Sequence, residues 1–322
     1  MSVVVVGSAN LDHVSRVERI PAPGETVLST SFALHPGGKG ANQATAAARA
    51  GAETTFIVAL GDDENGRRLA EGLRSDGVAL LARVCDEATG SAMISVSGDG
   101  ENAIVVNPGA NATLRELDER ERAAVRAADV LLVQLEVPLE TVAAALREAR
   151  GAGTVTVLNA APAADLPPGL LSDVDVLVVN EHEAALMAAA AREDGGGGRA
   201  EGEVEPDAAT LAARVATVLV TCGADGVLVA RRGEPIVRIP AHPAVVVDTT
   251  GAGDAFCGAL VAALAQAGDG WPDALESAVR FAAVAAALAV GRAGAAASIP
   301  CRDEIEAEAA GRAASTVLDS DA

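Results

Sequence analysis

The chain contains no tyrosine, only four phenylalanines and one tryptophan, although half of its 322 residues are apolar. A folded core must therefore be built from Ala, Val and Leu side chains. Positive charge is also scarce, since 24 Lys and Arg residues face 45 Asp and Glu residues, for a net charge of −21. Such acidity argues against nucleic acid or an anionic membrane as the main partner.

Cysteines and long apolar runs are equally sparse. The four cysteines are Cys85, Cys222, Cys257 and Cys301. They form no CxxC pair and have no neighbouring histidine cluster, a pattern that favours buried thiols over disulfides or zinc. The apolar N-terminal run is too short and too uncharged for a signal peptide. Alanine-rich runs such as 282–290 fall well short of the roughly 20 residues of a membrane span. We expect a cytoplasmic protein.

Short β-branched runs alternate with helical patterns along most of the chain. Strands are predicted at 3–6, 54–59, 130–135, 154–158, 176–179, 218–220, 227–230 and 244–247. Helices are predicted at 41–50, 65–76, 139–149, 183–191, 255–266 and 274–289. Apolar strands separated by helices predict an α/β fold with a doubly wound, mostly parallel sheet flanked by helices. Ligands of such sheets bind at the carboxyl ends of the strands. We expect residues 1–322 to form a single domain.

Three stretches depart from this alternation. Segments 12–35 and 89–106 carry alternating, partly polar strand patterns without an intervening helix, and they predict a small antiparallel sheet that acts as a lid. Segment 192–206 is rich in Gly and Glu and contains four consecutive glycines. It predicts a disordered surface loop rather than a domain linker, since the strand and helix pattern resumes after it.

One glycine-rich segment carries the strongest functional signal: Asp248-Thr249-Thr250-Gly251-Ala252-Gly253-Asp254-Ala255-Phe256. It joins the predicted strand 244–247 to the predicted helix 255–266. Unpaired N–H groups at a helix N-terminus suit a phosphate or a developing oxyanion. A carboxylate beside them could accept the proton of a hydroxyl that attacks a phosphoryl group. The segment therefore predicts a kinase for a small alcohol, the alternative being that Asp254 only complements the helix dipole. It lacks the third glycine of a Rossmann fingerprint.

A second glycine run contains Lys39, the only lysine of the chain. The run is Pro36-Gly37-Gly38-Lys39-Gly40-Ala41-Asn42-Gln43, and it lacks the first Gly and the final Ser or Thr of a Walker A motif. A compact ammonium group is useful where a planar guanidinium does not fit. Further polar side chains, Asn10, Asp12 and Glu136, follow two predicted strands. Carboxylates and amides that meet there would suit the hydroxyl groups of a sugar, although such residues often serve only in turns.

These two glycine segments resemble the two signatures of the PfkB carbohydrate kinase family. The first is 37–44, with Gly51 and Gly61 at the expected spacing, and the second is 248–259. Segments 23–26, 107–111 and 159–163 also resemble the family, so that the similarity covers nearly all of the chain. Within the family, the kinases that phosphorylate ribose are the most similar. The resemblance implies a ribokinase-like fold and the ATP-dependent phosphorylation of D-ribose at O5.

The resemblance also implies roles for individual residues. The general base is Asp254, and the backbone of Gly251, Ala252, Gly253 and Asp254 forms the anion hole. The sugar-binding residues are Asn10, Leu11, Asp12, Gly38, Lys39, Gly40, Ala41, Asn42 and Glu136, together with Asp254. The nucleotide side comprises Asn180 and Glu183, linked to Mg²⁺ and phosphate, and Thr221, Cys222, Gly223, Ala224, Asp225, Gly226, Gly253, Asp254 and Ala283. A potassium ion is expected at Asp248, Thr250, Ala289, Arg292, Gly294 and Ser298.

Other implications concern partners and alternatives. The family resemblance implies ATP, Mg²⁺ and K⁺ as cofactors and a homodimer that pairs through the lid, which would also protect strand edges. Ala283 departs from the His or Asn that such kinases often place near the adenine. Kinases for 2-deoxyribose or fructose remain open alternatives, as does a non-catalytic sugar or nucleotide sensor on the same fold. A nucleoside kinase would need more aromatic side chains than Phe32, and a sugar-phosphate kinase more cations than Arg16, Arg19 and Lys39.

Overall fold

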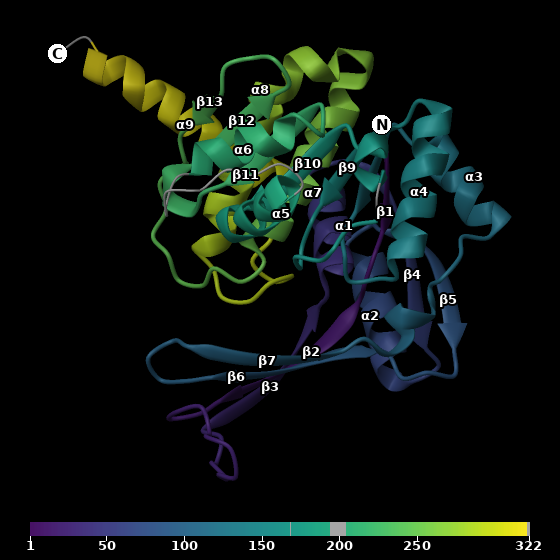
Figure 1. The fold of residues 1–322 in the computed structure, drawn as a ribbon. Helices are drawn as coiled ribbons and strands as arrows, with labels where there is room; N and C mark the ends of the chain where they lie inside the picture. Colours follow the sequence, from purple (N-terminus) through teal and green to yellow (C-terminus); the bar gives the residue numbers. More distant parts are fainter. Residues whose placement is uncertain (168, 194–203, 321–322) are drawn as a thin grey trace.

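The protein, seen here as a computed structural model that describes residues 1–167, 169–193 and 204–320, contains a large sheet and a small one (Figure 1). The large sheet has nine strands in the order β13-β12-β11-β10-β9-β8-β1-β4-β5. Its strands are β1 (Ser2–Val6), β4 (Glu53–Gly61), β5 (Ala79–Cys85), β8 (Val130–Val133), β9 (Val155–Asn159), β10 (Val176–Asn180), β11 (Thr217–Thr221), β12 (Val227–Arg231) and β13 (Val237–Ile239). All neighbours from β11 to β5 pair in parallel, and only the β11–β12 and β12–β13 pairs are antiparallel.

Two layers of helices cover this sheet. The helices are α1 (Lys39–Arg49), α2 (Glu64–Ser75), α3 (Glu119–Ala127), α4 (Leu139–Ala152), α5 (Glu181–Glu193), α6 (Val204–Ala212), α7 (Ala252–Ala267), α8 (Trp271–Val290) and α9 (Arg302–Ser320). Successive side chains of a strand point to opposite faces. Val3 and Val5 accordingly lie in the hydrophobic cluster under α1, α7 and α8, whereas Val4 and Val6 lie in the cluster under α4 to α6. The predicted doubly wound α/β fold is confirmed.

One predicted strand is wrong. Segment 244–247 has no strand partner among the described residues, and Val245 and Val246 are 84% and 64% exposed. The N–H groups of Val247 and Asp248 instead donate to the carbonyl of Val290 at the end of α8. The β-branched composition of the segment therefore reflects an extended loop over α8. Sequence patterns also missed β5, β13, α3, α6 and α9. Of these, β5 and β13 are the edge strands of the large sheet, and α9 is the last helix of the chain.

The small sheet is the predicted lid, and it projects from the body of the molecule (Figure 1). Its strands are β2 (Asn10–Arg16), β3 (Ser31–Gly37), β6 (Gly90–Val96) and β7 (Asn102–Asn107), in the order β3-β2-β6-β7. The expectation of a purely antiparallel lid is wrong, because the central strands β2 and β6 run parallel. Strand β2 follows β1 and strand β6 follows β5 in the chain, so both continue in the same direction from the carboxyl edge of the main sheet.

Part of the predicted loop 192–206 is helical. Residues 192–193 end α5 and residues 204–206 begin α6, while 194–203 lie outside the described residues. Helix α6 buries Ala208 and Leu211 against β11 and β12. The glycines of the segment hid this short helix from the sequence pattern.

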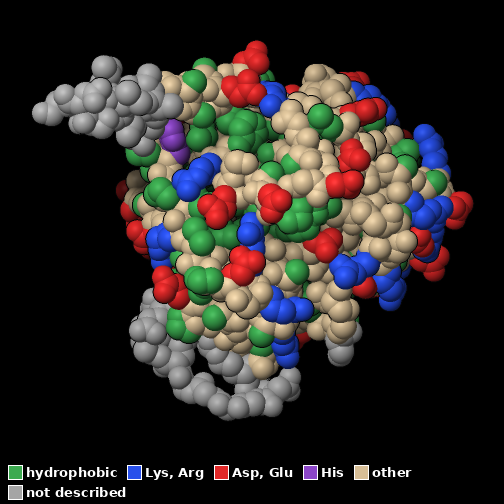
Figure 2. All heavy atoms as spheres, turned by 90° about the horizontal axis from the view of Figure 1, so that it is seen from above, with side chains coloured by type: hydrophobic (Ala, Val, Ile, Leu, Met, Phe, Trp, Pro, Cys, Tyr) green, Lys and Arg blue, Asp and Glu red, His purple; other side chains and the backbone are tan. Residues whose placement is uncertain are grey.

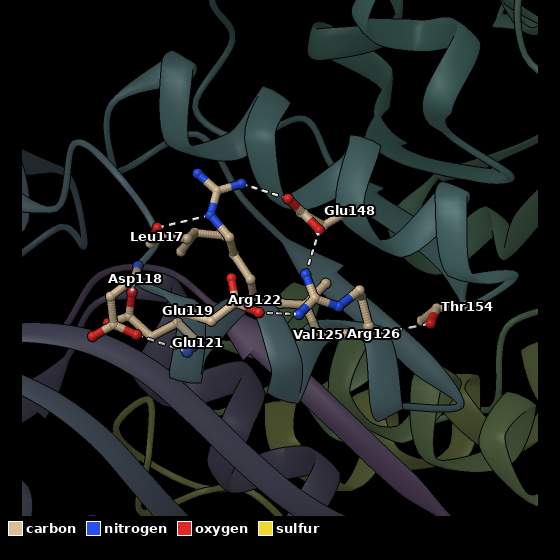
Figure 3. A network of polar contacts seen from close by, with 9 residues as sticks. All are labelled: Leu117, Asp118, Glu119, Glu121, Arg122, Val125, Arg126, Glu148 and Thr154. Atoms are coloured by element: carbon tan, nitrogen blue, oxygen red, sulfur yellow. Dashed lines mark hydrogen bonds and ion pairs between the residues drawn. The ribbon is translucent and has the colours of Figure 1, made fainter.

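Helix α3 is tied to α4 by a network of polar contacts (Figure 3). A capping box starts α3, since the N–H of Asp118 donates to Glu121 and the N–H of Glu121 donates to Asp118, both at 2.8 Å. Further along, Arg122 and Arg126 both donate to the carboxylate of Glu148 on α4. One carboxylate thus holds two successive turns of α3 in register with α4.

The outer surface carries both signs of charge. On the face turned toward the viewer in Figure 2, Asp and Glu side chains are interspersed with Lys and Arg side chains. This face therefore offers no broad region of a single charge to a polyanion. Among the described helices, none is long and apolar enough to cross a membrane.

Candidate active site

The second glycine segment starts helix α7, as the sequence predicted. Gly251 has a φ of 78°, and a Cβ there would lie 2.9 Å from the Cα of Ala295, so only glycine fits this turn. Asp254 is the third residue of α7 and is buried. Among the described residues, the N–H groups of Gly253 and Asp254 have no acceptor, while Ala252 N–H donates to Thr249. The helix thus presents free donors to the space beside Asp254.

The Asp254 carboxylate is held by the first glycine segment. Asn42 donates from Nδ2 to Oδ2 of Asp254 over 2.9 Å, and Gln43 donates from Nε2 to Oδ1 over 2.9 Å. Burial raises the pKa of Asp254, while the nearby Lys39 ammonium and these two amides oppose the rise. The amides and the lysine stabilise the ionised form, which is the form a proton acceptor needs.

Helix α1 begins where the lysine lies. Gly38 has a φ of 87°, and a Cβ there would lie 2.8 Å from the backbone N of Asn10, so that the loop can pass close to β2. The backbone N–H of Lys39 donates to Glu136 over 3.0 Å, and Ser8 also donates to Glu136. Burial lowers the pKa of Lys39, but Asp254 and Glu136 outweigh it and raise the value overall. Lys39 therefore remains a cation in this acidic site.

Two further polar side chains come from β2. Burial first, and then the charges of Glu136 and Asp254, raise the pKa of Asp12 to about 7. Asn10 is buried, and its Oδ1 accepts a hydrogen bond of 2.8 Å from Asn111. Lid, α1 and α7 thus bring together the carboxylates and amides that the sequence assigned to a sugar.

A cavity of about 300 Å³ joins Lys39 and Asp254 to the predicted nucleotide side, while Asn10, Asp12, Asn42 and Glu136 lie outside its lining. Its lining includes Lys39, Asn159, Asn180, Glu183, Thr221, Gly251, Gly253 and Asp254. Asn180 and Glu183 also cap helix α5, since each side chain accepts the backbone N–H of the other over 2.9 and 2.8 Å. Both residues therefore have a structural role in addition to lining the cavity.

Several predicted residues lie elsewhere. Leu11 and Ala41 are buried in the core, so that their side chains cannot reach a ligand. Cys222 is buried, while Gly223, Ala224 and Asp225 form an exposed 3-10 turn between β11 and β12. Gly226 is packed against the backbone of residues 239–241, and Ala283 lies half-buried on α8, outside the cavity lining.

The predicted potassium ligands gather beside the start of α7. Asp248 accepts the N–H of Thr250 and the N–H of Gly294, each over 2.9 Å. Burial pushes the pKa of Asp248 up, but these N–H groups hold it below its usual value. Ser298 is fully buried and donates to the carbonyl of Ala295. Ala289 is buried at the end of α8, and the Arg292 side chain pairs with Glu304.

Residues that the sequence did not single out support the site from behind. Gln134 donates to Gln43 over 2.6 Å, and Gln43 donates to Asn159 over 3.0 Å. Arg49 donates from Nη1 to the carbonyls of Ala296 and Ile299, both over 2.9 Å. The sequence held one hint of these contacts, since Gln43 and Asn159 lie in segments that resemble the family. The hydrogen bonds themselves join residues that are far apart in sequence, and a local pattern cannot reveal them.

Comparisons with known proteins show which proteins this chain is similar to. A model of the pfkB family carbohydrate kinases matches residues 1–302. The chain is 38% identical over 306 residues to a ribokinase of Haemophilus influenzae, covering 94% of this chain and 96% of that protein. It is also 38% identical to a bifunctional ribokinase/ribose-5-phosphate isomerase A of Fructilactobacillus sanfranciscensis, of which it spans 55%. The structure of Arabidopsis thaliana ribokinase complexed with ribose and ATP superposes with a TM-score of 0.85 at 33% identity, covering 95% of this chain and 97% of that one.

Proposed function

Because the chain belongs to the pfkB family of carbohydrate kinases, we propose that it transfers the terminal phosphoryl group of ATP to O5 of D-ribose. Relatives named ribokinase at 33–38% identity over most of their length support this substrate. The observation that carries the proposal is the position of Asp254, a buried carboxylate in the first turn of α7 next to N–H donors that have no acceptor within the described part of the chain.

In the proposed reaction, Asp254 is the general base. Its carboxylate orients the sugar hydroxyl and accepts its proton as the oxygen attacks phosphorus. The backbone N–H groups of Gly253 and Asp254 then stabilise the charge on the phosphoryl oxygens. Lys39 supplies a positive charge that acts on Asp254. The lid closes over the sugar side and excludes water.

The sugar is held by Asn10, Asp12, Asn42 and Glu136. Among the described residues, Oδ1 of Asn42 is buried without a hydrogen-bond partner, an arrangement that suits a hydroxyl donor from a ligand. Asp12 and Glu136 are acceptors for further hydroxyls. A site built to bind a 2-hydroxyl would discriminate against 2-deoxyribose, because the polar partner would be left unpaired.

The expected Mg²⁺ and K⁺ fit the donor sets present. Asn180 and Glu183 would hold Mg²⁺, which is usually bound through one or two carboxylates and the substrate phosphates and neutralises their charge. Asp248, Ser298 and the carbonyls of Thr250, Ala289, Arg292 and Gly294 form an all-oxygen set for K⁺. These ligands flank the Gly251 turn, so a monovalent cation there would add positive potential beside the anion site.

The proposal also covers the domain organisation, the oligomeric state and the cellular compartment. The chain works as one α/β unit with its lid, and two copies pair through their lids to form a homodimer. The exposed apolar side chains Phe32, Met93, Ile104, Val105 and Val106 of the lid strands support such pairing. Since ATP is the phosphoryl donor, the proposal places the reaction in the cytoplasm.

A sugar panel tests the substrate. ATP-dependent ADP release would be measured with ribose, 2-deoxyribose, fructose, fructose 6-phosphate and adenosine, each with and without potassium. We expect ribose to be the best substrate and potassium to raise its turnover. Higher activity with another sugar would keep the mechanism and replace the substrate. No turnover with any of the five compounds, while ribose still binds, would favour the sensor alternative.

A further inference from the structure

Three buried amide side chains form a branched hydrogen-bond network that contacts Asp254. Gln134, just beyond β8, donates from Nε2 to Oε1 of Gln43 over 2.6 Å. Gln43, on α1, donates from Nε2 to Oδ1 of Asp254 over 2.9 Å and to Oδ1 of Asn159 over 3.0 Å. Gln43 and Gln134 are fully buried, so water cannot replace these bonds.

The contacts fix the direction of the Gln43 amide. An amide has one oxygen that only accepts and one nitrogen that only donates. Gln134 directs its NH₂ at the oxygen of Gln43, which turns the NH₂ of Gln43 toward Asp254 and Asn159. The opposite orientation would place the Gln43 oxygen against the Asp254 carboxylate and the Gln134 NH₂ against another NH₂. Both contacts would then be repulsive.

The two oxygens of Asp254 therefore have different partners. Oδ2 is bonded to Asn42, which also has a free buried oxygen and lies at the sugar site. Oδ1 is bonded to Gln43, whose other partners are the buried amides of Asn159 and Gln134. Gln43 thus contacts the Asp254 carboxylate without itself lining the cavity.

We propose that Gln43, oriented by Gln134, is a positioning residue that fixes the rotation of the Asp254 carboxylate and keeps it ionised for proton transfer. This inference rests on the proposed function, since it assigns Gln43 to the same base. It predicts that removal of the Gln43 NH₂ slows the chemical step while both substrates still bind. It also predicts a shift in the pH at which the base becomes active, because a donor that stabilises the carboxylate has been lost.

The test compares Gln43→Met and Gln134→Met with the wild-type enzyme. Met keeps the length of the side chain and removes the amide. For Gln43→Met we expect kcat to fall by roughly tenfold to a hundredfold, with the KM values for ribose and ATP changed less than about threefold. The acid limb of the kcat profile should move to higher pH. Gln134→Met leaves Gln43 bonded to Asp254 and Asn159 and removes only the bond to its oxygen, so it should move the acid limb in the same direction by a smaller amount.

Gln266→Met is the matched control, because it removes an exposed amide at the other end of α7, where Gln266 accepts from Arg302. It should leave kcat and the pH profile unchanged. The inference is overturned if Gln43→Met keeps the wild-type kcat and acid limb, or if kcat and both KM values change together. If Gln43→Met does not fold, the pH profile of Gln134→Met tests the inference: an acid limb at higher pH supports it, and a wild-type acid limb overturns it. The proposed function fails separately, if Asp254→Asn retains turnover.

Discussion

Asn42 and Asp254, 212 positions apart in the chain, are joined by a hydrogen bond of 2.9 Å from Nδ2 to Oδ2. The bond connects the two glycine-rich segments, one at the start of α1 and the other at the start of α7. These helices pack against each other along their length, with Gly258 of α7 closely facing Ala46 of α1. The position of the carboxylate is therefore fixed by helix packing as well as by its own turn.

Asp254→Asn should abolish most turnover. A general base contributes about 10²–10⁴-fold in rate, so kcat should fall by that order. Asn keeps the volume of the side chain, and ribose and ATP should bind with nearly unchanged affinity in calorimetry. Asp269→Asn, an exposed position just beyond α7, serves as the control and should keep wild-type kcat. Loss of ligand binding in Asp254→Asn would assign the residue to structure rather than chemistry.

Asp12→Asn should stabilise the unliganded protein at high pH and weaken sugar binding. The folded state raises the pKa of Asp12 from 3.8 to about 7, so the folded protein holds a proton that the unfolded chain releases. Wild-type stability contributed by this group is present at low pH and is lost as the pH rises toward 7. The difference in Tm between Asp12→Asn and wild type should thus grow from pH 5 to about pH 7 and level off above it. A constant difference across that range contradicts the raised pKa.

Arg49→Met should loosen the segment that carries Ser298. Arg49 ties α1 to the carbonyls of Ala296 and Ile299 and also pairs with Asp76 over 2.7 Å. Loss of these partly buried contacts should cost about 1–3 kcal/mol of unfolding free energy in urea titrations. The potassium concentration that gives half of the Tm increase should rise. Arg74→Met, an exposed arginine on α2, should change neither quantity.

Glu148→Gln should weaken the contact between α3 and α4 (Figure 3). The carboxylate pairs with two arginines and its side chain is 23% exposed, so we expect a loss of about 0.5–1 kcal/mol at pH 7. Hydrogen bonds from Arg122 and then Arg126 hold the pKa of Glu148 below its usual value of 4.5. The stabilisation is present above that value and is lost as the pH falls. Glu71→Gln on α2 is the control, and an equal loss in both variants would contradict the role of the network.

The sequence by itself determined the fold class and predicted where the chemistry would lie. Strand and helix periodicity is a local property, and it placed the core strands and six helices close to their observed bounds. The two glycine segments were equally visible, because turns such as those at Gly38 and Gly251 demand glycine where they occur. Resemblance to a family then supplied candidate roles for the residues around them.

Only the tertiary structure decided which side chains meet. The exposed 244–247 segment has a strand-like composition, yet its N–H groups bond to the end of α8, a contact that no local pattern contains. The parallel pairing of β2 with β6 depends on how two distant segments leave the sheet. The same holds for the hydrogen bonds from Gln134 through Gln43 to Asp254, which join three elements. Such contacts depend on packing across the whole chain, because the free energy that selects them comes from burial of groups far apart in sequence.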